Sequence, residues 1–291
     1  MKKRILVGIL LVLGIASALV ADLFLAPWYP FLLLVCLSGS FLATRELIEL
    51  YKHSSISPST NLLTSAVLAV LFSNWIPHIN WIPAQNHSWQ VTGGTAIGFY
   101  FLIMLLEMFK FRSPGISTNN LSFAAFLIVY IGLLPSFLIQ LRWIDSETNT
   151  LTGLLCLGMT ITVTKSCDIG AYFTGKFFGK NLMTPLLSPK KTWEGFVGGI
   201  SFSALTAFLW FKIFPQTPLC CEPAAIAFGI IIGLVGVYAD LVESLIKRDL
   251  KTKDASQVIP GFGGILDLLD SLLLIGPIAW IFFLCNPWNF K

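Results

Sequence analysis

Residues 223–243 read Pro-Ala-Ala-Ile-Ala-Phe-Gly-Ile-Ile-Ile-Gly-Leu-Val-Gly-Val-Tyr-Ala-Asp-Leu-Val-Glu, and Asp240 is their first charged residue. A helix needs about 20 mainly apolar residues to cross a bilayer. Because backbone polar groups in lipid must be satisfied within the segment, such a run is expected to be helical. This stretch therefore predicts a membrane-spanning helix with acidic side chains near its C-terminal end.

Similar apolar runs recur along the chain. Eight more lie near residues 5–26, 30–45, 62–77, 95–109, 121–141, 150–168, 196–214 and 265–285. The first run follows a basic start, as a signal peptide does, but its length and the many later runs favour an uncleaved span. We predict an all-α, polytopic membrane bundle of about nine transmembrane helices. Spans 1–5 form an N-terminal region (1–145), and spans 6–9 form a catalytic region (146–291) with loops 165–195 and 244–266.

Composition supports this fold class. Hydrophobic residues make up 55% of the 291 residues and charged residues only 12%, whereas soluble domains carry about 25% charged residues. The mean hydropathy is +0.78. A water-soluble protein needs a more polar surface, so lipid must solvate much of this chain. The six cysteines are scattered without a CxxC pattern, which argues against a thiolate metal site.

The distribution of basic residues predicts the orientation. If nine spans alternate, 16 of the 19 Lys and Arg residues lie on the side of the N-terminus, and only Arg142, Lys212 and Lys291 lie on the other. Cytoplasmic loops of membrane proteins carry such an excess. We therefore expect a multi-pass protein of the cell's inner (plasma) membrane with a cytoplasmic N-terminus.

Polar residues gather on that cytoplasmic side in two segments, 165–195 and 240–270. Asp168, Asp240 and Asp267 all fall near predicted span ends, where acids are costly and by default functional. On a continued helix, one polar stripe would hold Asp240, Glu243, Ser244, Lys247, Lys251 and Asp254. The plainer alternatives are ion pairs between helices and a solvated surface stripe.

Carboxylates beside many cations fit a site where a divalent ion and phosphates lie between them. Mg²⁺ binds through one or two carboxylates plus substrate phosphates, and Lys and Arg neutralise phosphate oxygens. Gly261, Gly263 and Gly264 either line a nucleotide site or form a tight turn. The residues alone thus predict a cytoplasm-facing membrane enzyme that acts on phosphate-bearing substrates with Mg²⁺.

Both segments resemble the phosphatidate cytidylyltransferase (CDP-diacylglycerol synthase) family. The stretch from Ser244-Leu-Ile-Lys247-Arg248 through Pro260-Gly261 and Gly263-Gly264 to Asp267 and Asp270 looks like that family's signature. Ser188-Pro-Lys-Lys-Thr-Trp-Glu-Gly195 and Asp168-Ile-Gly-Ala-Tyr172 match its other characteristic stretches. The resemblance is specific over roughly 165–275, and upstream it is one of hydropathy only.

The resemblance implies transfer of CMP from CTP to phosphatidate, which releases pyrophosphate. It implies Mg²⁺, with a second monovalent or divalent cation left open, membrane lipid around the spans, no nucleic-acid partner, and a homodimer as a family-level expectation. The implied catalytic residues are Asp240, Asp267, Lys247, Arg248 and Asp270, with Asp240, Asp267 and Asp168 as metal ligands. The implied substrate-binding residues are Ser188, Lys190, Lys191, Thr192, Lys253, Gly263 and Gly264.

Two positions depart from the family pattern. Phe262 stands where the family usually has His, and Leu268 stands where it usually has Arg after the aspartate of the ninth span. Loss of a cation there weakens phosphate binding unless another basic residue substitutes for it. The sequence leaves two rival functions open: a CTP-dependent kinase of a lipid alcohol such as a polyprenol, and a transporter that uses intramembrane acids.

Overall fold

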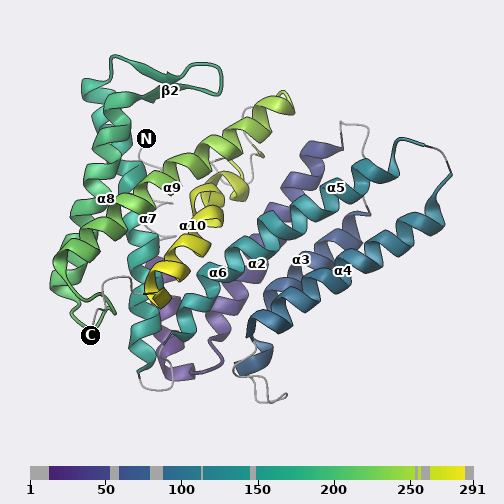
Figure 1. Cartoon of the computed structure of the whole chain (residues 1–291), viewed down its shortest axis with the longest axis horizontal. Coiled ribbons are helices and arrows are strands. Elements are labelled where there is room, and N and C mark those ends of the chain that lie inside the picture. Colours follow the sequence, from purple (N-terminus) through teal and green to yellow (C-terminus); the bar gives the residue numbers. More distant parts are fainter. Residues whose placement is uncertain are drawn as a thin grey trace. The chain divides into compact units, whose positions relative to one another are not determined.

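The computed structural model describes residues 13–52, 59–78, 88–112, 114–144, 149–252, 255–256 and 263–285. Within these ranges the chain is mostly helical (Figure 1), and eight helices are long and apolar enough to cross a membrane. A shorter apolar helix, Leu13–Leu25, covers the described part of the first predicted span. The polytopic all-α class is thereby confirmed, and each of the other eight predicted spans coincides with one of the long apolar helices.

The chain divides into two compact units. The first comprises residues 1–136 and 250–269. In it, α2 (Pro30–Tyr51) packs on α3 (Thr60–Ser73), α3 on α4 (Ser88–Lys110) and α4 on α5 (Ser117–Leu127). Helix α5 continues through a π-helical turn (Ile128–Leu133) into α6 (Leu134–Gln140). The predicted boundary at residues 145/146 separates an N-terminal region from a catalytic region. This functional division stays a prediction.

A buried carboxylate fixes the start of α2 in this first unit. Asp22 is fully buried, and its carboxylate accepts hydrogen bonds from the backbone N–H groups of Phe31 at 3.0 Å and Leu32 at 2.7 Å. It thereby caps α2, whose first residue is Pro30. Proline suits this position because its missing N–H would have no partner inside the helix.

The second unit comprises residues 137–249 and 270–291. Its helices α7 (Thr150–Phe178), α8 (Trp193–Ile213) and α9 (Glu222–Asp249) lie side by side (Figure 1). Helix α10 (Ile265–Cys285) begins in the first unit and contributes Asp270 onward to the second. Rings of Phe282 and Phe283 on α10 pack on Phe228 of α9, at centroid distances of 5.2 and 5.0 Å.

One prediction about a helix end is wrong. The sixth span was expected to end at 168, but α7 continues to Phe178, so much of the predicted loop 165–195 is helical. The apolar eighth span was predicted to end near 243, and α9 continues past it to Asp249, as the predicted polar stripe on a continued helix requires. Hydropathy marks the segment that lipid can cover, whereas a polar helix can continue beyond it because its backbone bonds are internal.

The predicted polar stripe on α9 is correct only as far as Lys247. Lys251 lies beyond the end of the helix, with a φ of +56° that interrupts helical geometry. Asp254 lies outside the described residues. The remainder of the first predicted loop forms an antiparallel hairpin of β1 (Leu182–Thr184) and β2 (Ser188–Thr192), in which Leu182 pairs with Thr192.

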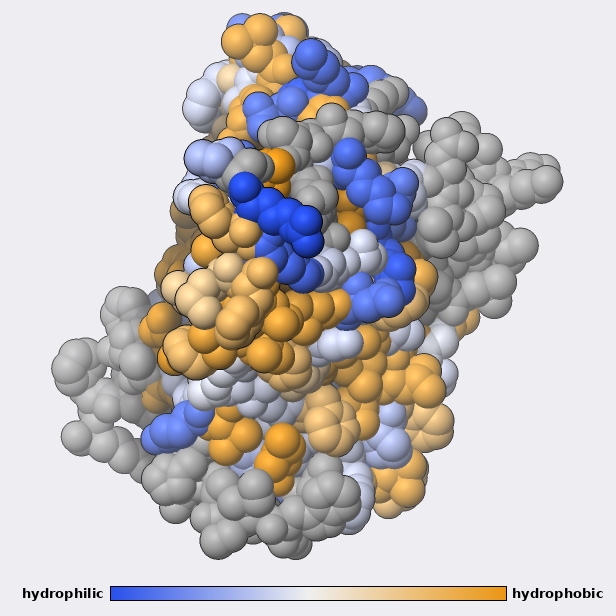
Figure 2. All heavy atoms as spheres, turned by 90° about the vertical axis from the view of Figure 1, so that its right-hand side faces the viewer, coloured by the Kyte–Doolittle hydropathy of each residue, from blue (hydrophilic) through white to orange (hydrophobic). Residues whose placement is uncertain are grey.

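Apolar side chains cover wide areas of the face shown in Figure 2. Phe109 is 79% exposed and Ile97 72%. Large exposed apolar areas on a soluble monomer would mark a binding surface or an aggregation hazard. On helices of this length and hydropathy they are the surface that lipid solvates.

Candidate active site

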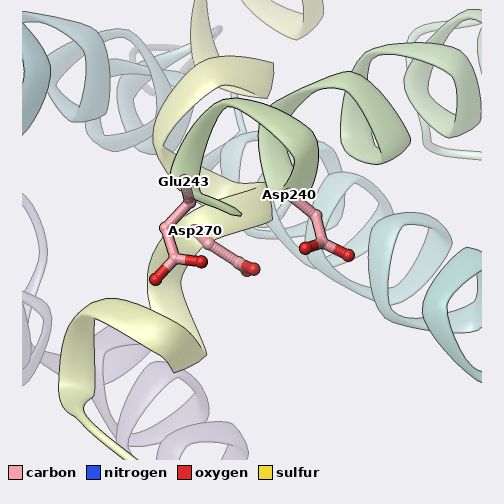
Figure 3. Close-up of side chains that lie close together, drawn as sticks. All are labelled: Asp240, Glu243 and Asp270. Atoms are coloured by element: carbon pink, nitrogen blue, oxygen red, sulfur yellow. The ribbon is translucent and has the colours of Figure 1, made fainter. Parts of the chain in front are cut away.

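Three carboxylates meet in the second unit. Asp240 and Glu243 project from α9 and Asp270 from α10 (Figure 3). One oxygen from each lies within 4.8 Å of the others. Asp240 and Glu243 share a helix face because they are three residues apart. Like charges this close repel one another strongly, so nearby cations or a shared proton must offset the repulsion.

Lysines from three elements accompany these carboxylates. The Lys191 ammonium, from β2, lies 2.8 Å from Asp240 Oδ2, and the Lys247 ammonium lies 2.5 Å from Glu243 Oε2 on the same helix. On α7, the Lys165 ammonium lies 3.2 Å from Asp168 Oδ2 and donates to Ser271 Oγ at 2.8 Å. The side chain of Glu243 is only 1% exposed, so its pairing with Lys247 offsets a large desolvation cost.

The Ser188–Gly195 stretch forms β2 and the start of α8. Thr192 is the N-cap of α8 and accepts a hydrogen bond from the Gly195 N–H at 3.1 Å. Glu194 accepts from the backbone N–H groups of Lys180 and Asn181 at 3.1 and 3.3 Å. These contacts fix the hairpin against the first turn of α8. They hold the strand that carries Lys191 in place.

Arg248 connects α9 to the same hairpin. Its Nε donates to the Leu187 carbonyl oxygen at 3.2 Å. This contact places a guanidinium group beside the turn between β1 and β2. Within the second unit, Arg248 of the second predicted segment therefore contacts the hairpin that carries the basic residues of the first.

Asp267, a predicted metal ligand, makes its described contacts within the first unit. Its Oδ2 accepts from the Gly264 N–H at 2.7 Å and the Ala255 N–H at 3.1 Å. Gly263 has a φ of +99°, and a Cβ there would lie 2.6 Å from Asp267 Oδ2. These contacts support the tight-turn alternative for Gly263 and Gly264, whereas Gly261 lies outside the described residues. The group of three carboxylates does not include Asp267.

Glu46 is a buried carboxylate that supports the start of α10 and that the sequence pattern did not single out. Its Oε1 accepts from Ser256 Oγ at 2.6 Å and from the Ile265 N–H at 3.0 Å, and its Oε2 accepts from the Leu266 N–H at 2.9 Å. One carboxylate on α2 thus caps the N-terminus of α10. The predicted span 30–45 ended one residue too early to flag Glu46 as an intramembrane acid.

Several predicted residues are thus brought together and others are not. The second unit gathers Asp240, Asp270, Asp168, Lys191, Lys247 and Arg248, and it adds Glu243 and Lys165, which the prediction had not assigned to the site. Ser188 and Lys190 lie on β2, where Lys190 is exposed. Lys253 and Phe262 lie outside the described residues.

Comparison with known proteins decides the family. The sequence model of the Cytidylyltransferase family matches residues 2–286. The chain belongs to this family. A phosphatidate cytidylyltransferase of a Synechocystis species is 30% identical, with 93% of each chain covered, and that of Bacillus subtilis is 30% identical, with 96% of each covered. The protein of that name from Chlamydia muridarum is 35% identical over 62% of this chain and 61% of its own.

Because the chain belongs to the Cytidylyltransferase family and has membrane-spanning helices, it is a membrane-bound nucleotidyltransferase. The match extends over nearly the whole chain, so it includes the N-terminal spans that the motifs left undecided. The matches favour neither the lipid-alcohol kinase nor the transporter, the two rivals that the sequence had left open.

Proposed function

We propose that this chain transfers CMP from CTP to phosphatidate, giving CDP-diacylglycerol and pyrophosphate. Two relatives that the chain covers almost completely carry the name of this activity. The observation that carries the proposal is the cluster of Asp240, Glu243 and Asp270 beside Lys191. Grouped carboxylates and an adjacent cation are what a reaction between two phosphate groups needs.

The carboxylate cluster fits a Mg²⁺ ion. Magnesium is a hard cation that takes oxygen ligands and keeps positions for substrate phosphates. Asp240, Glu243 and Asp270 would hold the ion, since one oxygen of each lies within 4.8 Å of the others. The ion would supply charge neutralisation at the phosphates. Direct roles for Asp168 and Asp267 as metal ligands stay predictions.

The reaction joins two phosphates without an enzyme nucleophile. A phosphate oxygen of phosphatidate attacks the α-phosphorus of CTP, and the bond to the β-phosphate oxygen breaks as pyrophosphate leaves. Positioning and electrostatic stabilisation dominate such transfers. Lys190, Lys191, Lys247 and Arg248 would bind the phosphate oxygens, with Ser188 and Thr192 shaping the strand that carries the two lysines.

The site is proposed to face the cytoplasm of a bacterial inner membrane. The bacterial relatives and the bias of basic residues toward one side support this location. CTP is a cytosolic nucleotide, and the lipid substrate would reach the site from the inner leaflet with its tails among the spans. The phosphate groups of both substrates would then meet at the membrane boundary.

Product identity tests the proposal. Purified protein is incubated with CTP labelled at the α-phosphorus, Mg²⁺, and either phosphatidate or a polyprenol. A labelled liponucleotide that forms with phosphatidate supports CMP transfer. Labelled CDP together with a polyprenol phosphate would instead identify the kinase. An absence of CTP turnover with both lipids, in protein that remains folded, would reject a CTP-dependent transferase.

A further inference from the structure

Lys165 is a basic residue of the second unit that lies beside the acidic residues and that the proposed chemistry leaves unassigned. It lies on α7, and its ammonium contacts Asp168 Oδ2 at 3.2 Å and Ser271 Oγ at 2.8 Å. Ser271 directly follows Asp270 on α10 and is fully buried. Lys165 therefore joins the acidic turn of α7 to the turn of α10 that supplies one carboxylate of the cluster.

The charges around this lysine are predominantly negative. Asp270 lies within electrostatic range of Lys165, Asp168 and Asp240. The side chain of Lys165 is 34% exposed, so solvent reduces its interactions but does not cancel them. Together with Lys191, which pairs with Asp240, this ammonium offsets the mutual repulsion of acids from three different helices.

The other two lysines have different partners. Lys191 pairs with Asp240 and Lys247 with Glu243. Asp270 is a member of neither ion pair, and Lys165 contacts the next residue on α10, Ser271, at 2.8 Å. Position 268, where the resemblance leads one to expect Arg, holds Leu in this chain. Lys165 on α7 thus places a cation beside the turn of α10 that has none at position 268.

We propose that Lys165 is the built-in counter-cation of the acidic cluster formed by Asp240, Glu243 and Asp270. Its positive charge lowers the affinity of the cluster for divalent ions and raises the affinity of the site for the triphosphate of CTP. It is a positioning residue, because its contacts are to Asp168 and Ser271 on the protein. The inference deepens the proposed function and rests on it for the identity of the nucleotide. Its effect on ion binding does not depend on turnover.

The proposal predicts opposite changes in two affinities. Replacing Lys165 with Met keeps the length of the side chain and removes one positive charge. The more negative cluster then binds a divalent ion more tightly, by on the order of three- to tenfold for a charge a few ångströms away in a partly solvated site. The KM for CTP rises, because a cation that attracts the triphosphate is gone.

Ion binding is measured first, without nucleotide. Mn²⁺ is titrated into purified protein, and free Mn²⁺ is followed by electron paramagnetic resonance. Lys165→Met is expected to lower the dissociation constant, and Lys165→Arg to restore the wild-type value. Lys176→Met is the matched control, because it removes the same charge from the same helix. The Lys176 ammonium lies over the rings of Tyr172 and Phe177 and not beside the carboxylates.

The KM for CTP is then measured with phosphatidate for the same four proteins. A role limited to packing would lower the melting temperature and kcat while leaving Mn²⁺ affinity and KM unchanged. Unchanged or weaker Mn²⁺ binding by Lys165→Met would overturn the inference. Failure of the proposed function looks different: the wild-type protein would then form no liponucleotide from phosphatidate, whatever the Mn²⁺ titrations show.

Discussion

The carboxylate of Glu46 accepts a hydrogen bond from the backbone N–H of Leu266 at 2.9 Å, across 220 residues of sequence. The same side chain, 7% exposed as a residue, also accepts from the Ile265 N–H and Ser256 Oγ. Helix N-termini leave backbone donors without partners inside the helix and carry partial positive charge. A glutamate on α2 therefore supplies the cap that local sequence would normally provide.

Glu46→Gln should destabilise the protein and reduce its activity. The amide keeps one acceptor but turns a donor toward backbone N–H groups, and the charge opposite the helix dipole is lost. We expect a loss of about 1–3 kcal/mol in the free energy of unfolding, measured by thermal unfolding in detergent. Glu49→Gln, on the same helix but at an exposed ion pair with Lys52, should change little. Equal stability of both variants would refute the capping role.

Asp270→Asn should abolish CMP transfer without unfolding the protein. The substitution keeps the shape of the side chain and removes one of three clustered carboxylates, so divalent-ion affinity should fall and turnover should drop by more than about 100-fold. Mn²⁺ titration and liponucleotide formation are the two measurements. Asp249→Asn, at the exposed end of α9, is the control. Full turnover by Asp270→Asn would remove this residue from the site.

Asp267→Asn should also abolish CMP transfer while the protein stays in the membrane. Asp267 accepts hydrogen bonds from the backbone N–H groups of Gly264 and Ala255, and an uncharged amide oxygen accepts them more weakly than a carboxylate. Mn²⁺ titration of the variant separates two causes of the loss. Weakened Mn²⁺ binding would establish Asp267 as a metal ligand, and unchanged binding would assign it to the turn. Wild-type turnover would exclude both.

The spans and the acidic residues could be predicted because their signals are local. An apolar run long enough to cross a bilayer is visible in any window of about 20 residues, and Asp240 stands out against the apolar residues before it. The ends of α7 and α9 could not be predicted this way. Lys176 and Lys247 lower the hydropathy of their windows but do not break a helix.

The partners of each acid were outside the reach of sequence patterns. The interval from Asp240 to Glu243 gave them a common face, but nothing local showed that Asp270 would join them and that Asp267, three residues earlier, would cap a turn. Lys165 meets Ser271 across 106 residues and Glu46 meets Leu266 across 220. Only the packed helices determine such pairs.

Close packing of α8 on α9 gives the last prediction. A Cβ at Gly229 would lie 2.6 Å from Ser203 O and from Ala204 Cα, which are backbone atoms that cannot rotate away. Gly229→Ala should therefore push the two helices apart and cost about 1–3 kcal/mol of stability. Gly98→Ala is the control, because no atom lies within 4 Å of a Cβ there and alanine favours the helix. Since α9 carries Asp240 and Glu243, Gly229→Ala should also raise the Mn²⁺ concentration that half-saturates the protein. A variant as stable as Gly98→Ala, with wild-type Mn²⁺ binding, would show that the interface between α8 and α9 tolerates the added methyl group.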